Sequence, residues 1–296
     1  MATKVPLAIR KEIRDTWEPE VPKLESQLAE MLGVPWKIEI DGAAMYRASS
    51  HGQPGCMLKQ YLEATVHNLK EFVDKFGANG KQELDAVASA HIITMEETDN
   101  TAIPYCGCDV YQGKLRILFR KGCFATNIKQ ATYCDKLQEA LNMAGEADAP
   151  LNFNARSGIK ADYEPKIGIV KERLEAIIGI QGLSVRPNFE ANYAALDGKP
   201  GQARDWQKLL GRYTLLYFQG LVDNLTLAGF EKDDMLQEGL QEVMEKKEIS
   251  FEVVDKLAKG TYNEVVLENG VLCIRTVPAM YNSNMNKVGS KLLDLL

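Results

Sequence analysis

Cysteine is the residue type in this sequence best suited to hold a metal ion. Cys106 and Cys108 form one Cys-x-Cys pair, and Cys123 and Cys134 follow it downstream. Thiolates bind zinc well, but a structural zinc site usually draws on two closely spaced pairs, and the sequence holds one. Because Cys106 and Cys108 alternate with other residues in a predicted strand, we expect them to be small, buried and reduced side chains. We predict no metal site and no cofactor.

Histidine is the next candidate for catalysis. The chain has three, His51, His67 and His91, which lie far apart in sequence. His51 precedes Cys56 in a polar loop, which leaves open a Cys–His nucleophile pair with Asp41 and Tyr46 as further polar groups. Spacing reveals no third group that would orient His51. The sequence also lacks a Walker A loop, a G-x-S-x-G elbow and a dinucleotide fingerprint, so we predict no catalytic residues.

Four cations cluster on the predicted outer face of a β-hairpin: Lys114, Arg116, Arg120 and Lys121. We take them as candidate partner-binding residues, because an anion or an acidic protein would bind such a cluster. A solvated face whose cations are balanced by neighbouring acids is the alternative interpretation.

Three aromatic residues share a predicted helix: Trp206, Tyr213 and Tyr217. They are our candidate ligand-binding residues, since aromatic side chains commonly line pockets for small apolar ligands. Their helical spacing suits a core-facing stripe equally well.

The elements that carry these residues occur twice in the chain. Residues 105–123 align without a gap on residues 262–280. Asn269-Gly270 is typical of a two-residue type I′ turn, and Gln112-Gly113 is its weaker counterpart. Each segment is therefore predicted to be a β-hairpin. Pairing Tyr111 with Lys114 in the first hairpin places both cysteines of the Cys-x-Cys pair on its apolar face.

The other predicted elements recur in the same order. They are strands at 36–40 and 189–193, long helices at 57–76 and 206–228 that end at Gly77 and Gly229, and closing helices at 136–141 and 291–296. We predict an α+β fold made by tandem duplication of an α-β-α-α-β-β-β-α unit. Each unit has a mainly antiparallel four-stranded sheet covered by helices, and the units pack as a pseudo-twofold pair. The predicted boundaries are a lead-in at 1–15, a first repeat at 16–145, a linker at 146–161 and a second repeat at 162–296.

Composition narrows the classes of partner. The 296 residues are 45% hydrophobic and 26% charged, with a net charge of −6. An acidic chain is a poor candidate for nucleic-acid binding. The N-terminus has no apolar signal segment and the most apolar helix is interrupted by charges, so we expect a soluble, cytoplasmic protein without membrane insertion.

The predicted helices and strands recur in both halves of the chain, whereas most of their polar residues do not. This favours a non-catalytic interaction or structural protein whose partner is another protein. Two alternatives stay open: an intracellular carrier of a small apolar ligand, and an enzyme with a site between the two halves.

Overall fold

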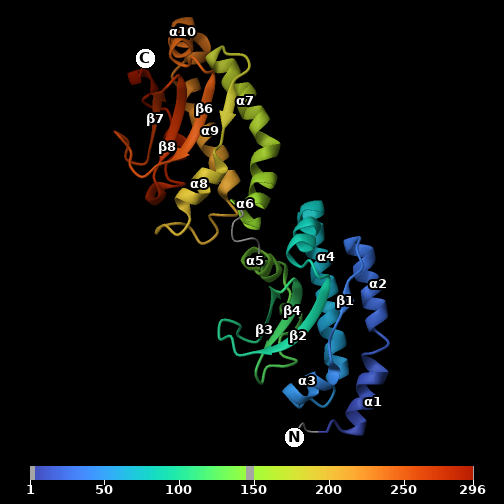
Figure 1. Cartoon of the computed structure of the whole chain (residues 1–296). Helices are drawn as coiled ribbons and strands as arrows, with labels where there is room; N and C mark the ends of the chain where they lie inside the picture. The colour runs from blue at the N-terminus through green and yellow to red at the C-terminus, as the bar shows by residue number, and fades with distance from the viewer. Residues whose placement is uncertain (1–3, 145–149, 296) are drawn as a thin grey trace. The chain divides into compact units, whose positions relative to one another are not determined.

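The structure, a computed structural model, describes residues 4–144 and 150–295 (Figure 1). The chain divides into two compact units, Met1–Asp148 and Ala149–Leu296, called unit 1 and unit 2 below. Each unit combines a four-stranded sheet with helices. Within the described ranges, no helix is both long enough and apolar enough to cross a membrane.

The elements of unit 1 are, in chain order, α1 (Leu7–Thr16), α2 (Val21–Leu32), β1 (Lys37–Ile38), α3 (Gly42–Ser49), α4 (Pro54–Val87), β2 (Ile92–Thr98), β3 (Cys106–Tyr111), β4 (Lys114–Arg120), η1 (Ile128–Gln130) and α5 (Cys134–Ala144). The elements of unit 2 are α6 (Phe153–Gly158), the π-helical turn η2 (Ile159–Tyr163), α7 (Glu164–Ile178), β5 (Ser184–Arg186), α8 (Phe189–Leu196), α9 (Leu210–Leu227), η3 (Phe230–Lys232), α10 (Asp234–Val243), β6 (Glu248–Val253), β7 (Asn263–Glu268), β8 (Val271–Thr276) and the short turns η4 (Pro278–Met280), η5 (Met285–Lys287) and η6 (Leu292–Leu295).

The two sheets have the same topology. Their strand orders are β1-β2-β4-β3 and β5-β6-β8-β7, and in each the first three strands are parallel while the edge strand is antiparallel. The sheets are therefore mixed, and the prediction of mainly antiparallel sheets is wrong. The helices between the first two strands of each unit return the chain to the same end of the sheet, which permits parallel pairing.

The predicted hairpin geometry is confirmed. Tyr111 pairs with Lys114 and Cys106 with Phe119, as the alternation of side chains required. Both central residues of the second turn have positive φ, 52° at Asn269 and 77° at Gly270, as a type I′ turn demands. The first turn has the same form.

The strand predicted at residues 189–193 is wrong, because these residues lie in α8 and the strand is the earlier β5. Asn188, with φ 49°, turns the chain from β5 into α8. The buried Asn192 then bonds to β6, donating to the Phe251 carbonyl (3.0 Å) and accepting from the Val253 N–H (2.7 Å). An asparagine side chain on a helix thus satisfies backbone groups that a longer strand would otherwise pair.

Gly77 has non-helical backbone angles (φ 57°, ψ −140°), so the first helical stretch of α4 ends there as predicted, and a second stretch continues to Val87. Two other predicted boundaries move. The second long helix begins at Leu210, four residues later than predicted. The closing segment of unit 2 forms the single 3-10 turn η6 instead of a regular helix.

The lead-in and part of the linker are packed helices. Ile13 of α1 lies against Gly55 of α4, and Ile159 of η2 lies against Gly211 of α9. In both cases a Cβ on the glycine would come within 3.0 Å of the isoleucine Cα, so only glycine lets the backbones approach this closely. Each unit therefore begins with a helix that the sequence analysis assigned to a connecting segment.

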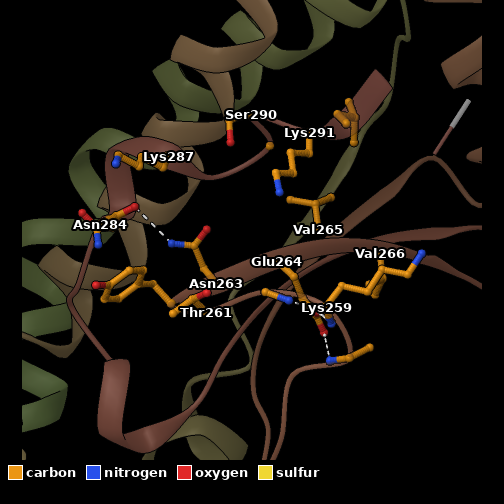
Figure 2. Close-up of a pocket in the computed structure, with 15 residues that line it drawn as sticks. Lys259, Thr261, Asn263, Glu264, Val265, Val266, Asn284, Lys287, Ser290 and Lys291 are labelled. Carbon is orange, nitrogen blue, oxygen red and sulfur yellow. Dashed lines mark hydrogen bonds between the residues drawn. The ribbon is translucent and has the colours of Figure 1, made fainter. Parts of the chain in front are cut away.

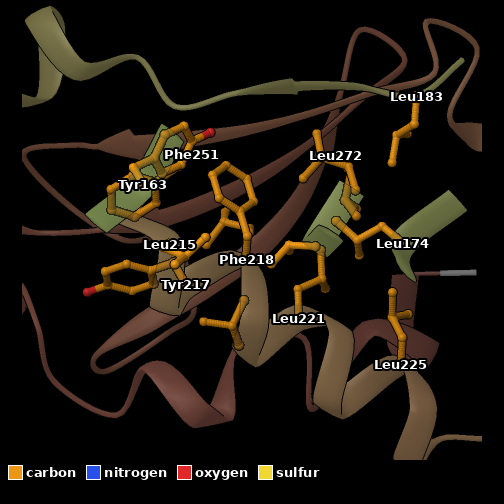
Figure 3. Close-up of a cluster of buried hydrophobic side chains, with 14 of the residues drawn as sticks. Tyr163, Leu174, Leu183, Leu215, Tyr217, Phe218, Leu221, Leu225, Phe251 and Leu272 are labelled. Atoms are coloured by element: carbon orange, nitrogen blue, oxygen red, sulfur yellow. The ribbon is translucent and has the colours of Figure 1, made fainter. Parts of the chain in front are cut away.

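The core of unit 2 lies between α9 and the sheet (Figure 3). Phe218, Leu221 and Leu225 of α9 have no exposed surface. They meet buried residues of the central strands, including Phe251 and Leu272. Apolar burial of this kind contributes about 1.5–3 kcal/mol per large side chain.

Candidate functional site

The three aromatic residues predicted to bind a ligand lie in or against the core of unit 2. Tyr217 is fully buried and its ring stacks on Phe251, with centroids 4.4 Å apart. Trp206 is 7% exposed and packs on Tyr193. Tyr213 is half-buried against Tyr281. These contacts are those of a packed aromatic cluster.

The predicted cation cluster of unit 1 is partly neutralised. Arg116 forms a two-pronged ion pair with Asp109 (2.8 and 2.6 Å) and a further bond to Glu96 (3.0 Å). Lys114 pairs with Glu39 at 2.9 Å. Arg120 and Lys121 are exposed beyond this network. Two of the four cations on this face are thus paired with acids of unit 1.

In the structure His51 and the polar residues near it in sequence form local contacts. His51 accepts a hydrogen bond from the Gln53 N–H (3.2 Å) and packs edge-on against Phe124. The Cys56 N–H donates to Glu12 (2.8 Å), which holds the start of α4. Asp41 caps α3 by accepting from Ala43, and Tyr46 lies in the same helix. His67 and His91 each lie within ion-pair distance of one acid, Glu71 and Asp85.

Cys106 and Cys108 are free thiols on the core-facing side of β3, but only Cys106 is buried as predicted. Cys106 is 2% exposed and donates to the Asn127 carbonyl (3.1 Å), while Cys108 is half-buried. Burial raises the pKa of both thiols, that of Cys108 to about 12. Among the described residues, no group of three or more His, Cys, Asp or Glu side chains is arranged to hold a metal ion.

A hollow lies elsewhere, at the outer edge of β7 in unit 2 (Figure 2). It has a volume of about 430 Å³ and is bounded by two segments. One segment is the loop before β7 together with the first residues of that strand, 258–266. The other runs through η5 to the start of η6 and contributes Asn284, Lys287 and residues 289–292. We call this hollow the β7-edge pocket.

Glu264 organises one wall of the β7-edge pocket. Its carboxylate accepts the backbone N–H groups of Ala258 (2.9 Å), Lys259 (2.8 Å) and Gly260 (3.0 Å). Burial alone would raise the pKa of Glu264, but these three donors and the nearby Arg275 hold it below its usual value. The charge of Glu264 is therefore used to hold the loop and is not directed at a ligand.

Asn263 ties the two walls together. Its side-chain amide donates to the Asn284 carbonyl at 3.0 Å, a bond drawn in Figure 2. Asn284 itself has positive φ (49°), which turns the chain into η5. The amide of Asn263 and the carboxylate of Glu264 are thus both committed to internal hydrogen bonds.

The groups left for a ligand are mainly cationic. Lys287 and Lys291 extend from the second wall, and Lys259 lies on the first (Figure 2). All three are exposed, and none forms an ion pair with a described residue. Thr261 and Ser290 add hydroxyls, and Val265, Val266 and Leu292 add apolar surface. The β7-edge pocket is therefore positively charged with an apolar floor, on a chain whose net charge is −6.

The corresponding edge of unit 1 is covered. There α5 packs along β3 and against α4, and the Lys136 ammonium donates to the Cys106 carbonyl (2.9 Å). In unit 2 the described contact with β7 on this side comes from η6. The matched edge strands β3 and β7 thus differ in what lies against them.

The sequence analysis did not identify the β7-edge pocket. The lysines gave no signal, because Lys259, Lys287 and Lys291 come from segments that no motif connects. Compared with models of protein families, with curated proteins and with solved structures, the chain shows no match.

Proposed function

We propose that this protein is a non-catalytic interaction protein built from two similar α/β units, and that the β7-edge pocket of unit 2 binds a protein partner. The observation that carries the proposal is the contrast between two matched sheet edges. The edge strand β3 is covered by α5, whereas β7 borders a pocket with three lysines that have no described ion-pair partner.

The chemistry of the pocket supports binding over catalysis. Among the described lining residues Glu264 carries the only carboxylate, which is held by three backbone donors, and the amide of Asn263 is held by Asn284. The described lining contains no histidine or cysteine. Exposed lysines beside apolar side chains give a partner both charged groups that can set specificity and apolar surface that can be buried.

The test is a comparison of binding partners between the unaltered protein and a charge-reversed variant, Lys287→Glu/Lys291→Glu. Lys232→Glu serves as the control, since Lys232 is an exposed lysine in η3 that does not line the pocket. We expect a partner recovered with the unaltered protein and with Lys232→Glu to be lost with the double variant. An unchanged set of partners in all three proteins would refute the proposal.

Tandem duplication remains our interpretation of the two units, and equivalent contacts support it. Asn68 of α4 donates to the Lys129 carbonyl (2.9 Å), and Asn224 of α9 donates to the Asn286 carbonyl (2.8 Å). Both bonds join the long helix to the turn that follows the hairpin. The pseudo-twofold packing of the units stays a prediction, which small-angle scattering tests, and so does the cytoplasmic location, which fractionation tests.

A further inference from the structure

We propose that Asn269-Gly270, the two central residues of the turn between β7 and β8, is a site of spontaneous deamidation in the folded protein. The products carry aspartate or isoaspartate at position 269. The turn does not line the β7-edge pocket, so the modification is independent of the proposed function.

The reaction takes place within the dipeptide itself. The backbone nitrogen of Gly270 attacks the side-chain Cγ of Asn269, a C–N bond forms, and the amide group leaves as ammonia with the proton that the Gly270 nitrogen releases. Water then opens the resulting succinimide ring at either of its carbonyls. One opening gives aspartate, and the other gives isoaspartate, in which the main chain runs through the former side chain. Glycine favours ring closure because it has no Cβ to hinder the approach of its nitrogen.

Both reacting groups are accessible in the structure. Asn269 is exposed, and its side chain forms no hydrogen bond with a described residue. The N–H of Gly270 likewise donates to no group in the described part of the chain. The strand pairing closes the turn between its outer residues, Glu268 and Val271, and leaves the central peptide unbonded. Neither the amide nor the attacking nitrogen is therefore held by a hydrogen bond.

The turn conformation itself is what resists ring closure. Asn269 has a φ of 52°, and its backbone must rotate out of the type I′ geometry before the Gly270 nitrogen can reach Cγ. Outside the hairpin, one hydrogen bond holds the turn, from the Lys246 N–H to the Gly270 carbonyl (3.1 Å). Exposed tips of this kind open at a small fraction of the free energy needed to open a packed helix. We therefore expect deamidation to proceed in the folded chain.

Unit 1 provides a matched turn with a different amide. Gln112-Gly113 joins β3 to β4 with φ values of 51° and 72°. The Gly113 carbonyl accepts the Ala90 N–H (2.9 Å), as the Gly270 carbonyl accepts that of Lys246. Glutamine has one more methylene than asparagine, so attack by the following nitrogen would form a six-membered ring, which closes far more slowly. The two turns thus share a backbone and differ in reactivity.

The other Asn-Gly pair in the sequence, Asn79-Gly80, lies in α4. Gly80 is buried, and a Cβ there would be 2.8 Å from the Phe76 Cβ and 2.9 Å from the Phe72 ring. Ring closure at this pair would require a packed helical turn to unwind. Asn79-Gly80 is therefore the internal reference for the same dipeptide in a protected setting.

Deamidation changes both the charge and the geometry of the β7–β8 turn. Either product places a carboxylate next to Glu268, where like charges repel. Isoaspartate also adds a methylene to the main chain, which a two-residue turn does not accommodate. Gly270 lies close to Glu245, since a Cβ on the glycine would be 3.0 Å from the Glu245 Cβ. A displaced turn would therefore also lose its bond to Lys246, and we expect faster hydrogen exchange in β7, β8 and residues 244–247.

The test follows the whole 296-residue chain during incubation at pH 8 and physiological temperature. Peptide mass spectrometry measures deamidation at positions 79 and 269, with a zero-time sample to correct for reaction during digestion. Electron-transfer fragmentation distinguishes isoaspartate from aspartate. The protein variants are Asn269→Gln, which copies the unit 1 turn, and Gln112→Asn, which copies the unit 2 turn. Circular dichroism and melting curves check that both are folded, and a sample unfolded in urea serves as the positive control.

We expect position 269 to react at least ~10-fold faster than position 79, which corresponds to about 1.4 kcal/mol in the free energy of opening. Asn269→Gln should abolish the reaction in this turn, and Gln112→Asn should introduce it at position 112. The rate at position 269 should fall when the pH is lowered to 6, because the attacking nitrogen must lose its proton.

A position 269 that reacts in urea but not in the folded chain would overturn the proposal. So would a rate at position 79 that equals or exceeds the rate at position 269, or a Gln112→Asn variant that stays unmodified at position 112. Deamidated protein whose hydrogen exchange in β7, β8 and residues 244–247 matches that of the fresh protein would overturn the expected loosening of the turn.

Discussion

Glycine 211 provides the sharpest test of how unit 2 is assembled. It lies in the first turn of α9, where a Cβ would come 2.6 Å from the Gly158 carbonyl oxygen and 2.7 Å from the Ile159 Cα. Ordinary contacts of a Cβ lie at 3.4–4 Å, so Gly211→Ala must push two backbone segments apart by about 0.7 Å. Backbone atoms cannot rotate away as a side chain would.

The expected magnitude follows from two opposing terms. Alanine improves helix propensity by about 0.5–1 kcal/mol relative to glycine. Overpacking in a closely packed contact costs about 1–3 kcal/mol, and this contact lies at the upper end because both neighbours are backbone. We expect Gly211→Ala to lower the free energy of unfolding of unit 2 by about 2–2.5 kcal/mol.

Gly168→Ala is the matched control. Gly168 lies within α7, and a Cβ there would have no atom within 4 Å. The same substitution should therefore stabilise unit 2 by about 0.5–1 kcal/mol. The two alanine variants differ in what their Cβ meets and are expected to change stability in opposite directions.

The assay is urea unfolding followed by hydrogen exchange and mass spectrometry, which reports each unit separately. Peptides from α9 and η2 should lose protection at lower urea in Gly211→Ala and at higher urea in Gly168→Ala. Peptides from α4 and the sheet of unit 1 should be unaffected by either. Equal stability of the two variants, or a loss confined to unit 1, would refute the assignment of residues 153–163 to the packed core of unit 2.

Three further predictions concern single side chains. Asn68→Ala should destabilise unit 1 by about 2–3 kcal/mol, because Asn68 is 3% exposed and donates to Lys129 and Thr132. Asn224→Ala, at a half-buried site, should destabilise unit 2 by about 1 kcal/mol. Hydrogen exchange measures both losses, and a larger loss for Asn224→Ala would contradict the argument. A brief treatment with iodoacetamide at pH 8 should leave Cys106 unmodified, since burial limits access to the thiol and its raised pKa lowers the thiolate fraction. Mass spectrometry measures the modification. Rapid modification would show that the thiol is accessible. The pKa of Glu264 is lowered in the folded protein, so its ionised form stabilises unit 2 above the unfolded pKa of about 4.3, and this contribution is lost as the pH falls through the lower folded value. The difference in unfolding free energy between the unaltered protein and Glu264→Gln should therefore shrink in acid. A difference that does not change with pH would contradict this.

Local patterns in the sequence predicted those features of the fold that depend on residues close together in the chain. The register of the first hairpin, the positive φ of Asn269 and the left-handed ends of the helices at Gly33 and Gly179 all follow from short-range stereochemistry. The parallel pairing of β2 with β4 did not, because it depends on which hairpin strand enters the sheet. Asn192 in α8 likewise satisfies backbone groups of β6, a long-range bond that no alternation in residues 189–193 indicates.

The candidate site was hidden for a related reason. The sequence analysis searched for residue types that recur in both copies, and the β7-edge pocket arises where the copies differ. At matched positions Cys106 donates to Asn127 and Asn263 donates to Asn284, so different side chains form the same bond to the turn after the hairpin. The hydrogen bond from the edge strand to this turn is thus kept, while the element that contacts the edge strand changes from α5 in unit 1 to η6 in unit 2.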